Sequence, residues 1–77
     1  MSSTVYSEEY KHFIQRLKRA RILAGLTQQE AAKRLKKRQT YISKCEQGER
    51  RIDVIELKKF SNLYHKPLSY FLVESGE

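Results

Sequence analysis

Residues 27–46 constrain the fold of this chain more than any other segment. They contain two short stretches with apolar residues at helical spacing, joined by a basic turn at residues 36–38. Thr27 and Glu30 form a T-x-x-E capping box, which predicts a helix start. Gly48 can take the left-handed conformation that ends a helix. Two short helices joined by so tight a turn predict a helix-turn-helix.

Composition limits the function classes. The 77 residues include 16 Lys and Arg against 9 Asp and Glu, a net charge of +7, which favours a polyanionic partner, either nucleic acid or an acidic membrane surface. The apolar fraction of 39% suits one small bundle but not an enzyme with a deep pocket. A single cysteine permits no internal disulfide and suits a reducing cytoplasm. We find neither a run of about 20 apolar residues nor a signal-peptide pattern, so we expect a cytoplasmic protein, nucleoid-associated when bound to DNA.

The periodicity predicts a single all-α domain of five helices over residues 8–73, between a flexible arm at residues 1–7 and a flexible tail at residues 74–77. Gly25 is expected to end the first helix. The third helix should begin at Arg38 or Gln39 and end at Gln47. The residues expected to face the core are Tyr10, Phe13, Ile14, Leu17, Ala20, Arg21, Ala24, Leu26, Ala31, Ala32, Leu35, Ile42, Cys45, Glu46, Leu57, Phe60, Tyr64, Leu68, Phe71 and Leu72, with Val54 or Ile55 nearby.

Two further signals delimit the last helices. Asp53 and Glu56 repeat the capping-box pattern at the start of the fourth helix. Pro67 suits the first position of the fifth, where its missing N–H would have no helical partner. Tyr70 and Val73 are then left for another surface.

The outer face of the third helix carries the side chains that point to a function. Thr40, Ser43, Lys44 and Gln47 share this face, and Gln39 precedes them. The DNA major groove is about 12 Å wide and admits one helix. Glutamine can bond adenine through two hydrogen bonds, threonine can donate to a base or touch a thymine methyl group, and lysine prefers guanine acceptors. This face therefore predicts contact with base edges, first through Gln39 and then through Lys44.

The strings L-T-Q-Q-E-A-A, from Leu26, and Y-I-S-K-C-E-Q-G, from Tyr41, resemble the lambda-repressor-like, Xre-type (Cro-like) helix-turn-helix family of transcriptional regulators over about residues 13–72. The resemblance implies a five-helix bundle that binds operator DNA as a symmetric dimer. A palindromic operator, a homodimer and a repressor-like role are the expectations that follow.

The resemblance also implies roles for individual residues. Gln28 matches a glutamine that touches phosphate, whereas Gln39 and Thr40 match residues that commonly contact bases. Tyr41 matches a position that reaches phosphate or packs on a base, Ser43 a phosphate contact, and Lys44 a base or phosphate contact. Arg50 and Arg51 match loop positions near the DNA backbone or minor groove. Arg21 and Glu46 match an interhelical salt bridge. The complete expected DNA-binding set is Gln28, Arg38, Gln39, Thr40, Tyr41, Ser43, Lys44, Gln47, Arg50 and Arg51.

Three residues depart from the family pattern. Lys36 stands where a glycine usually ends the second helix, so either the turn has a different shape or Lys36 adds a phosphate contact. A left-handed Lys would cost about 1–2 kcal/mol. Arg38 replaces the usual Ser or Thr cap of the third helix. His65 replaces a common glycine, although His tolerates that conformation better than most residues.

The remaining expectations concern partners. Tyr70, Phe71, Leu72 and Val73 are the apolar candidates for a dimer interface, because they exceed what a small core can absorb. No cofactor, metal, catalytic residue, membrane or small-molecule substrate is indicated. The alternative function is a protein-interaction module, an antitoxin or adaptor of the same fold, for which the C-terminal apolar segment would also serve.

Overall fold

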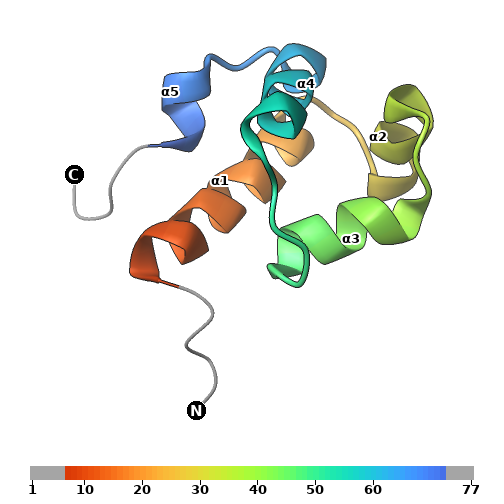
Figure 1. The fold of residues 1–77 in the computed structure, drawn as a ribbon. Coiled ribbons are helices and arrows are strands. Elements are labelled where there is room, and N and C mark those ends of the chain that lie inside the picture. The colour runs from red at the N-terminus through yellow and green to blue at the C-terminus, as the bar shows by residue number, and fades with distance from the viewer. Residues whose placement is uncertain (1–6, 73–77) are drawn as a thin grey trace.

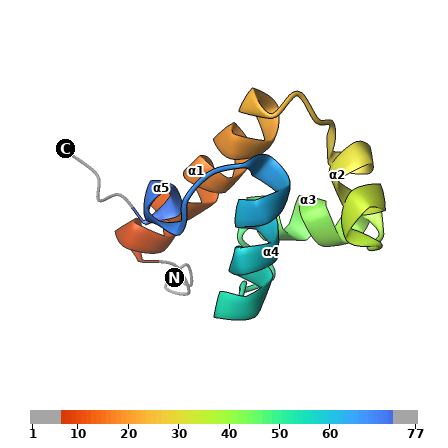
Figure 2. The same ribbon diagram turned by 90° about the horizontal axis from the view of Figure 1, so that it is seen from above.

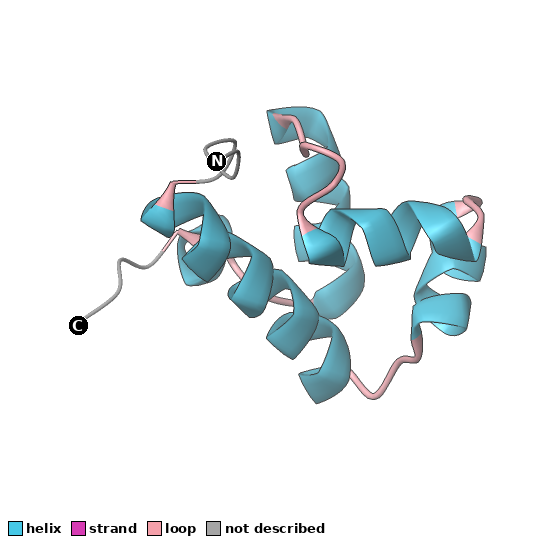
Figure 3. Cartoon of the chain, turned by 90° about the horizontal axis from the view of Figure 1, so that it is seen from below, coloured by secondary structure: helices cyan, strands magenta, loops and turns pink. Residues whose placement is uncertain are grey.

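The computed structural model describes residues 7–72, and every regular element in that span is a helix. Most of the expected arm, the expected tail and Val73 lie outside the described residues. The helices are α1 Glu8–Leu23, α2 Gln28–Leu35, α3 Gln39–Gln47, α4 Val54–Tyr64 and α5 Leu68–Phe71 (Figure 1). Figure 3 shows that short loops connect them. The predicted all-α class and the order of five helices are therefore confirmed.

Side-chain caps fix where three of the helices begin. Both predicted capping boxes are present: in α2, Thr27 Oγ1 accepts from the backbone N–H of Glu30 at 3.0 Å, and Glu30 Oε1 accepts from that of Thr27 at 2.9 Å. Asp53 and Glu56 repeat this arrangement in α4. Ser7 was expected in the flexible arm, but its Oγ accepts from the N–H of Tyr10 and caps α1. These bonds satisfy N–H groups that have no partner within the helix.

Two helices end on side-chain-bearing residues in the left-handed conformation. Lys36 has φ 60° at the end of α2, and His65 has φ 58° at the end of α4. Gly48 ends α3 in the same way, with φ 82°. The turn between α2 and α3 thus keeps the left-handed shape that glycine usually provides, although lysine occupies the position. A differently shaped turn, one of the two alternatives considered for Lys36, is therefore excluded.

The core lies where α1 crosses the other helices. α1 packs against α3, α4 and α5, while α2 packs against α3 and α4 (Figures 1 and 2). The buried apolar residues of the core are Phe13, Leu17, Ala20, Ala31, Ala32, Ile42, Cys45, Leu57, Phe60, Tyr64 and Phe71. Ala31 and Ala32 of α2 are buried, and their small side chains permit a neighbouring helix to approach closely.

Expectations for the last two helices need correction. Val54 and Ile55 are 69% and 60% exposed, because they belong to the first turn of α4, beyond the edge of the core. Leu68 and Leu72 were expected inward but are also exposed. Pro67 occupies the cap position of α5 rather than its first helical position.

The proposed dimer interface also changes. Phe71 is fully buried in the core of its own chain, with its ring 6.5 Å from that of Phe13, so it cannot belong to a dimer surface. Tyr70 is only half-buried and Leu72 is exposed. A helix of four residues turns its apolar side chains in different directions, so α5 does not form a single apolar face.

Candidate nucleic-acid interface

α3 lies at the edge of the bundle with one face buried and the other in solvent (Figure 1). Ile42 and Cys45 are fully buried. The opposite face contains Gln39, Thr40, Ser43, Lys44 and Gln47, of which only Ser43 is half-buried. Gln47 Nε2 donates to Ser43 Oγ at 3.3 Å. The expected division of α3 into an inner apolar and an outer polar face is therefore present.

A buried ion pair fixes α3 against α1. Arg21 Nε donates to Glu46 Oε2 at 2.7 Å, and Arg21 Nη2 donates to Glu46 Oε1 at 3.2 Å. The hydrogen bond to Glu46 raises the pKa of the Arg21 guanidinium above its ordinary value. Arg21 Nη1 also donates to the carbonyl of Leu26, in the loop before α2. This is the pair implied by the family resemblance, and it positions α3 relative to both α1 and α2.

Gln28 connects the first turn of α2 to the same carboxylate. Its Nε2 donates to Glu46 Oε1 at 3.0 Å, and the side chain is partly buried. A primary amide carries two N–H donors, and this hydrogen bond uses one of them to hold the side chain in place. The structure thus places Gln28 beside α3.

Tyr41 is less open than its neighbours on α3. Its ring stacks on Phe60 with the centroids 6.1 Å apart and the planes 4° apart, and its hydroxyl donates to Glu56 Oε2 at 3.1 Å. Burial raises the pKa of the Tyr41 phenol well above its ordinary value. The hydroxyl therefore keeps its proton and is engaged within the protein.

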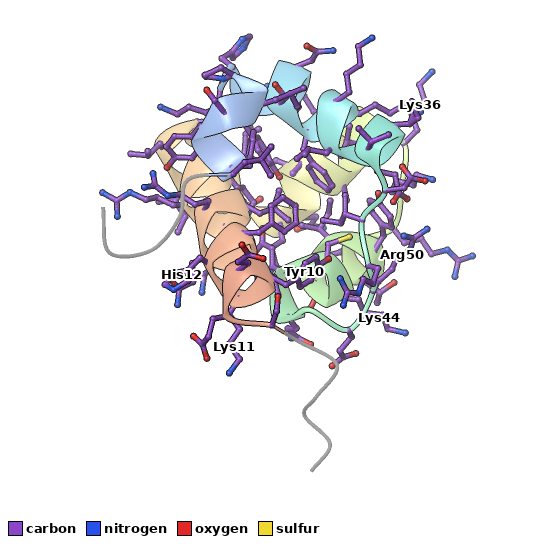
Figure 4. All side chains as sticks on the ribbon, turned by 60° about the vertical axis from the view of Figure 1, so that its left-hand side comes forward. Tyr10, Lys11, His12, Lys36, Lys44 and Arg50 are labelled. Carbon is purple, nitrogen blue, oxygen red and sulfur yellow. The ribbon has the colours of Figure 1, made fainter. Side chains whose placement is uncertain are left out.

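Basic side chains border α3 at both ends. Lys36, Lys37 and Arg38 are exposed before its first turn. Arg38 occupies the N-cap position of α3, and its side chain makes no capping hydrogen bond. Figure 4 shows Lys36, Arg50 and Lys44 along one side of the view, with Lys11 and His12 on α1. Exposed cations just before the first turn of a polar helix suit contact with a phosphate backbone beside base edges.

The loop between α3 and α4 is tied to the body of the domain. The Arg51 guanidinium carbon lies 4.4 Å above the Tyr10 ring, and the Tyr10 hydroxyl accepts from the N–H of Ile52 at 3.2 Å. Arg50 forms an ion pair with Glu56, with Nη2 3.0 Å from Oε2. Sequence reasoning missed the roles of Tyr10 and Glu56 in this loop. No local signal marks the Tyr10 contact, because 42 positions separate it from Ile52.

Residues 7–72 give little support to a nucleophilic cysteine, a metal site or a membrane-spanning helix. Cys45 is fully buried and burial raises the pKa of its thiol to about 11, so it is a core residue and a poor nucleophile. Within this span no group of three or more His, Cys, Asp or Glu side chains could hold a metal ion. None of the helices described is long and apolar enough to cross a membrane.

An exposed polar helix, joined by a tight turn to a second helix packed against it, defines a helix-turn-helix domain. A family model described as helix-turn-helix matches residues 17–71, most of the chain. The chain belongs to the lambda-repressor-like, Xre-type helix-turn-helix family, and its general function is that of a DNA-binding transcriptional regulator. Searches of curated proteins and of solved structures gave no match.

Proposed function

We propose that this protein regulates transcription by occupying a palindromic operator as a homodimer, with α3 in the major groove. The outer face of α3 is the observation that supports this proposal: Gln39, Thr40 and Lys44 are exposed on a helix whose inner face is fixed by the core and by Glu46. A preorganised helix can present its side chains to base edges without a further ordering cost.

Affinity and discrimination come from different residues in this proposal. Cationic side chains supply most of the affinity by releasing counterions from phosphates, and the base contacts of α3 supply the sequence preference. The residues to which we assign DNA contacts are Gln28, Arg38, Gln39, Thr40, Ser43, Lys44, Gln47, Arg50 and Arg51. Tyr41 was also expected among them, but its hydroxyl is bound by Glu56 and its ring stacks on Phe60, so we assign it no direct contact. Occupation of an operator would act by excluding or recruiting other proteins at that site, and exclusion corresponds to a repressor.

A second copy would extend the site. One domain contacts too few base pairs to select a genomic site, and two-fold symmetry doubles the contact. The two α3 helices would then lie about 34 Å apart, one turn of DNA. Of the four residues expected at the dimer interface, Tyr70 and Leu72 remain candidates and Val73 lies outside the described residues. Sedimentation at tens of micromolar protein tests whether the dimer forms without DNA.

Selection from a random DNA pool tests the proposal directly, and we expect a palindromic motif. Q39A and K44A should then weaken binding by about 1–3 kcal/mol each and relax the preference at the base that each contacts. Q15A and K18A are matched controls, because Gln15 and Lys18 are also exposed but belong to α1. Absence of any selected motif, with the fold intact, would favour the protein-interaction module.

Salt dependence provides an independent test. We expect the affinity for the selected DNA to fall steeply between low and physiological salt, because several phosphates exchange their counterions for Lys and Arg. K44A should make the slope shallower if Lys44 contacts phosphate and leave it unchanged if Lys44 contacts a base. An affinity that does not vary with salt would contradict the assigned phosphate contacts.

A further inference from the structure

The carboxylate of Glu56, in the first turn of α4, joins three segments of the chain. Its Oε1 accepts from the N–H of Asp53 at 2.9 Å and from Arg50 Nη1 at 3.2 Å. Its Oε2 accepts from the Tyr41 hydroxyl at 3.1 Å and lies 3.0 Å from Arg50 Nη2. The Glu56 side chain is only 18% exposed. One carboxylate thus connects the α4 cap, α3 and the loop between them.

Arg50 is held from several directions by these contacts. Besides the two-pronged pair with Glu56, its Nη1 donates to the carbonyl of Arg51 at 2.9 Å. Its guanidinium carbon lies 5.0 Å above the ring of Tyr41, which itself stacks on Phe60. The Arg50 side chain nevertheless remains 45% exposed. A long side chain in a solvent-facing loop is therefore fixed on a rigid aromatic surface.

The hydrogen bonds within residues 7–72 leave one edge of Arg50 open. A guanidinium has five N–H donors, and the contacts to Glu56 and to the Arg51 carbonyl use both donors of Nη1 and one of Nη2. Nε–H and the second Nη2–H remain, and they lie along one edge of the planar group. Such an edge matches two oxygens of a phosphate.

We propose that Glu56 is a positioning residue for DNA binding, which holds Arg50 on the Tyr41 ring with its open edge directed to a backbone phosphate. The inference rests on the function proposed above and deepens it. Tyr41 contributes as a support for Arg50 rather than through its hydroxyl. A fixed guanidinium avoids most of the ordering cost that a free arginine side chain pays on binding.

The charge of Glu56 has an opposite effect that the test must separate. A carboxylate near DNA repels phosphate, so neutralising it alone should strengthen binding. Glu49 supplies the matched control, because it is exposed and immediately precedes Arg50. E49Q removes the same charge from a neighbouring position, in the loop that carries Arg50, without altering the two-pronged contact. E56Q leaves an amide oxygen that can still accept in the α4 capping box, where Gln is also favoured.

The experiment measures the affinity of each variant for the selected operator DNA over a range of salt concentrations. We expect E56Q to bind roughly 3- to 10-fold more weakly than E49Q, from the ordering cost of one long side chain. The slope of log affinity against log salt should be shallower for E56Q by about 0.9, the value for one lost phosphate contact. In an R50A background, E56Q and E49Q should have equal affinity, because the residue that Glu56 positions is gone.

Several results would overturn the inference. If E56Q binds as tightly as E49Q or more tightly, Glu56 is neutral or competes with phosphate for Arg50. If E56Q remains weaker than E49Q in the R50A background, Glu56 acts through the α4 cap alone. Urea denaturation shows which variants are folded. Should E56Q not fold, R50K takes its place in the experiment. Lysine keeps the positive charge but lacks the two-pronged edge of a guanidinium. If R50K binds the operator as tightly as the unaltered protein does, the inference is refuted.

The two proposals can fail separately. If the unaltered protein selects no DNA and shows no salt-dependent affinity, the proposed function fails and the role of Glu56 fails with it. If the unaltered protein binds its operator and E56Q matches E49Q, only the role of Glu56 is refuted.

Discussion

Replacing Glu46 by alanine should remove a large part of the stability of this domain. Arg21 and Glu46 are each 8% exposed, and three hydrogen bonds reach the Glu46 carboxylate, two from Arg21 and one from Gln28. Among the partners that residues 7–72 provide, E46A would leave the buried Arg21 guanidinium only the carbonyl of Leu26. Loss of one member of a buried pair costs about 3–5 kcal/mol, because the other charge stays desolvated.

That cost is large for a chain of this size. At roughly 0.05–0.15 kcal/mol per residue, 77 residues give a free energy of unfolding of about 4–12 kcal/mol. E46A should therefore lower the urea midpoint strongly and leave a substantial unfolded population at 37 °C. E49A is the matched control, because Glu49 is exposed, and it should change the free energy by no more than about 0.5 kcal/mol.

A double variant distinguishes the buried charge from the lost contact. R21M/E46M removes both charges and fills the site with apolar side chains of similar length, so it should be considerably more stable than E46A. Urea denaturation followed by circular dichroism measures all four proteins. This prediction is refuted if E46A lowers the free energy of unfolding by less than about 1 kcal/mol. It is also refuted if the double variant is no more stable than E46A, because the unpaired buried guanidinium would then not be the cause of the loss.

The other predictions concern strain, ionisation and an unpaired hydroxyl. K36G should raise the free energy of unfolding by roughly 0.5–1 kcal/mol, because it relieves a left-handed lysine; H65G should raise it less, and a lower urea midpoint for K36G would contradict this. Burial raises the pKa of the Cys45 thiol to about 11 from its ordinary 9.0, so the folded state favours the protonated thiol. The stabilisation that this provides is complete below pH 9 and is lost as the pH rises to 11. Urea midpoints that stay constant from pH 8 to pH 11 would refute this prediction. The hydroxyl of Tyr64 is buried without a hydrogen-bond partner among residues 7–72, so Y64F should be neutral or stabilising by up to about 1 kcal/mol; a clear loss on thermal denaturation would show that the hydroxyl is bonded after all.

Local sequence signals predicted the helices well. The capping boxes of α2 and α4 and the left-handed Gly48 each depend on residues within four positions of one another, so their geometry follows from a short stretch of chain. The inner face of α3 followed from periodicity alone. The interhelical pair of Arg21 and Glu46 came from the family resemblance, since 25 positions separate the two residues.

Tertiary contacts decided what the sequence left open. Val54 lies three residues before Leu57 and should share its face, yet the core ends before the first turn of α4 and leaves Val54 in solvent. An apolar surplus near the C-terminus indicated a dimer surface, but it could not show that Phe71 fills the space beside Phe13. The contacts of Glu56 with Tyr41 and Arg50 likewise depend on how the loop after α3 folds back.

In the proposed function, one face of α3 carries the stability of the domain and the other face carries the choice of DNA sequence. Substitutions at Gln39, Thr40 or Lys44 alter no buried contact, whereas Ile42, Cys45 and Glu46 carry the packing that keeps the helix in place. Under the proposed function, substitutions at these exposed positions would change the DNA sequence that is bound while the packing that holds α3 in place stays constant.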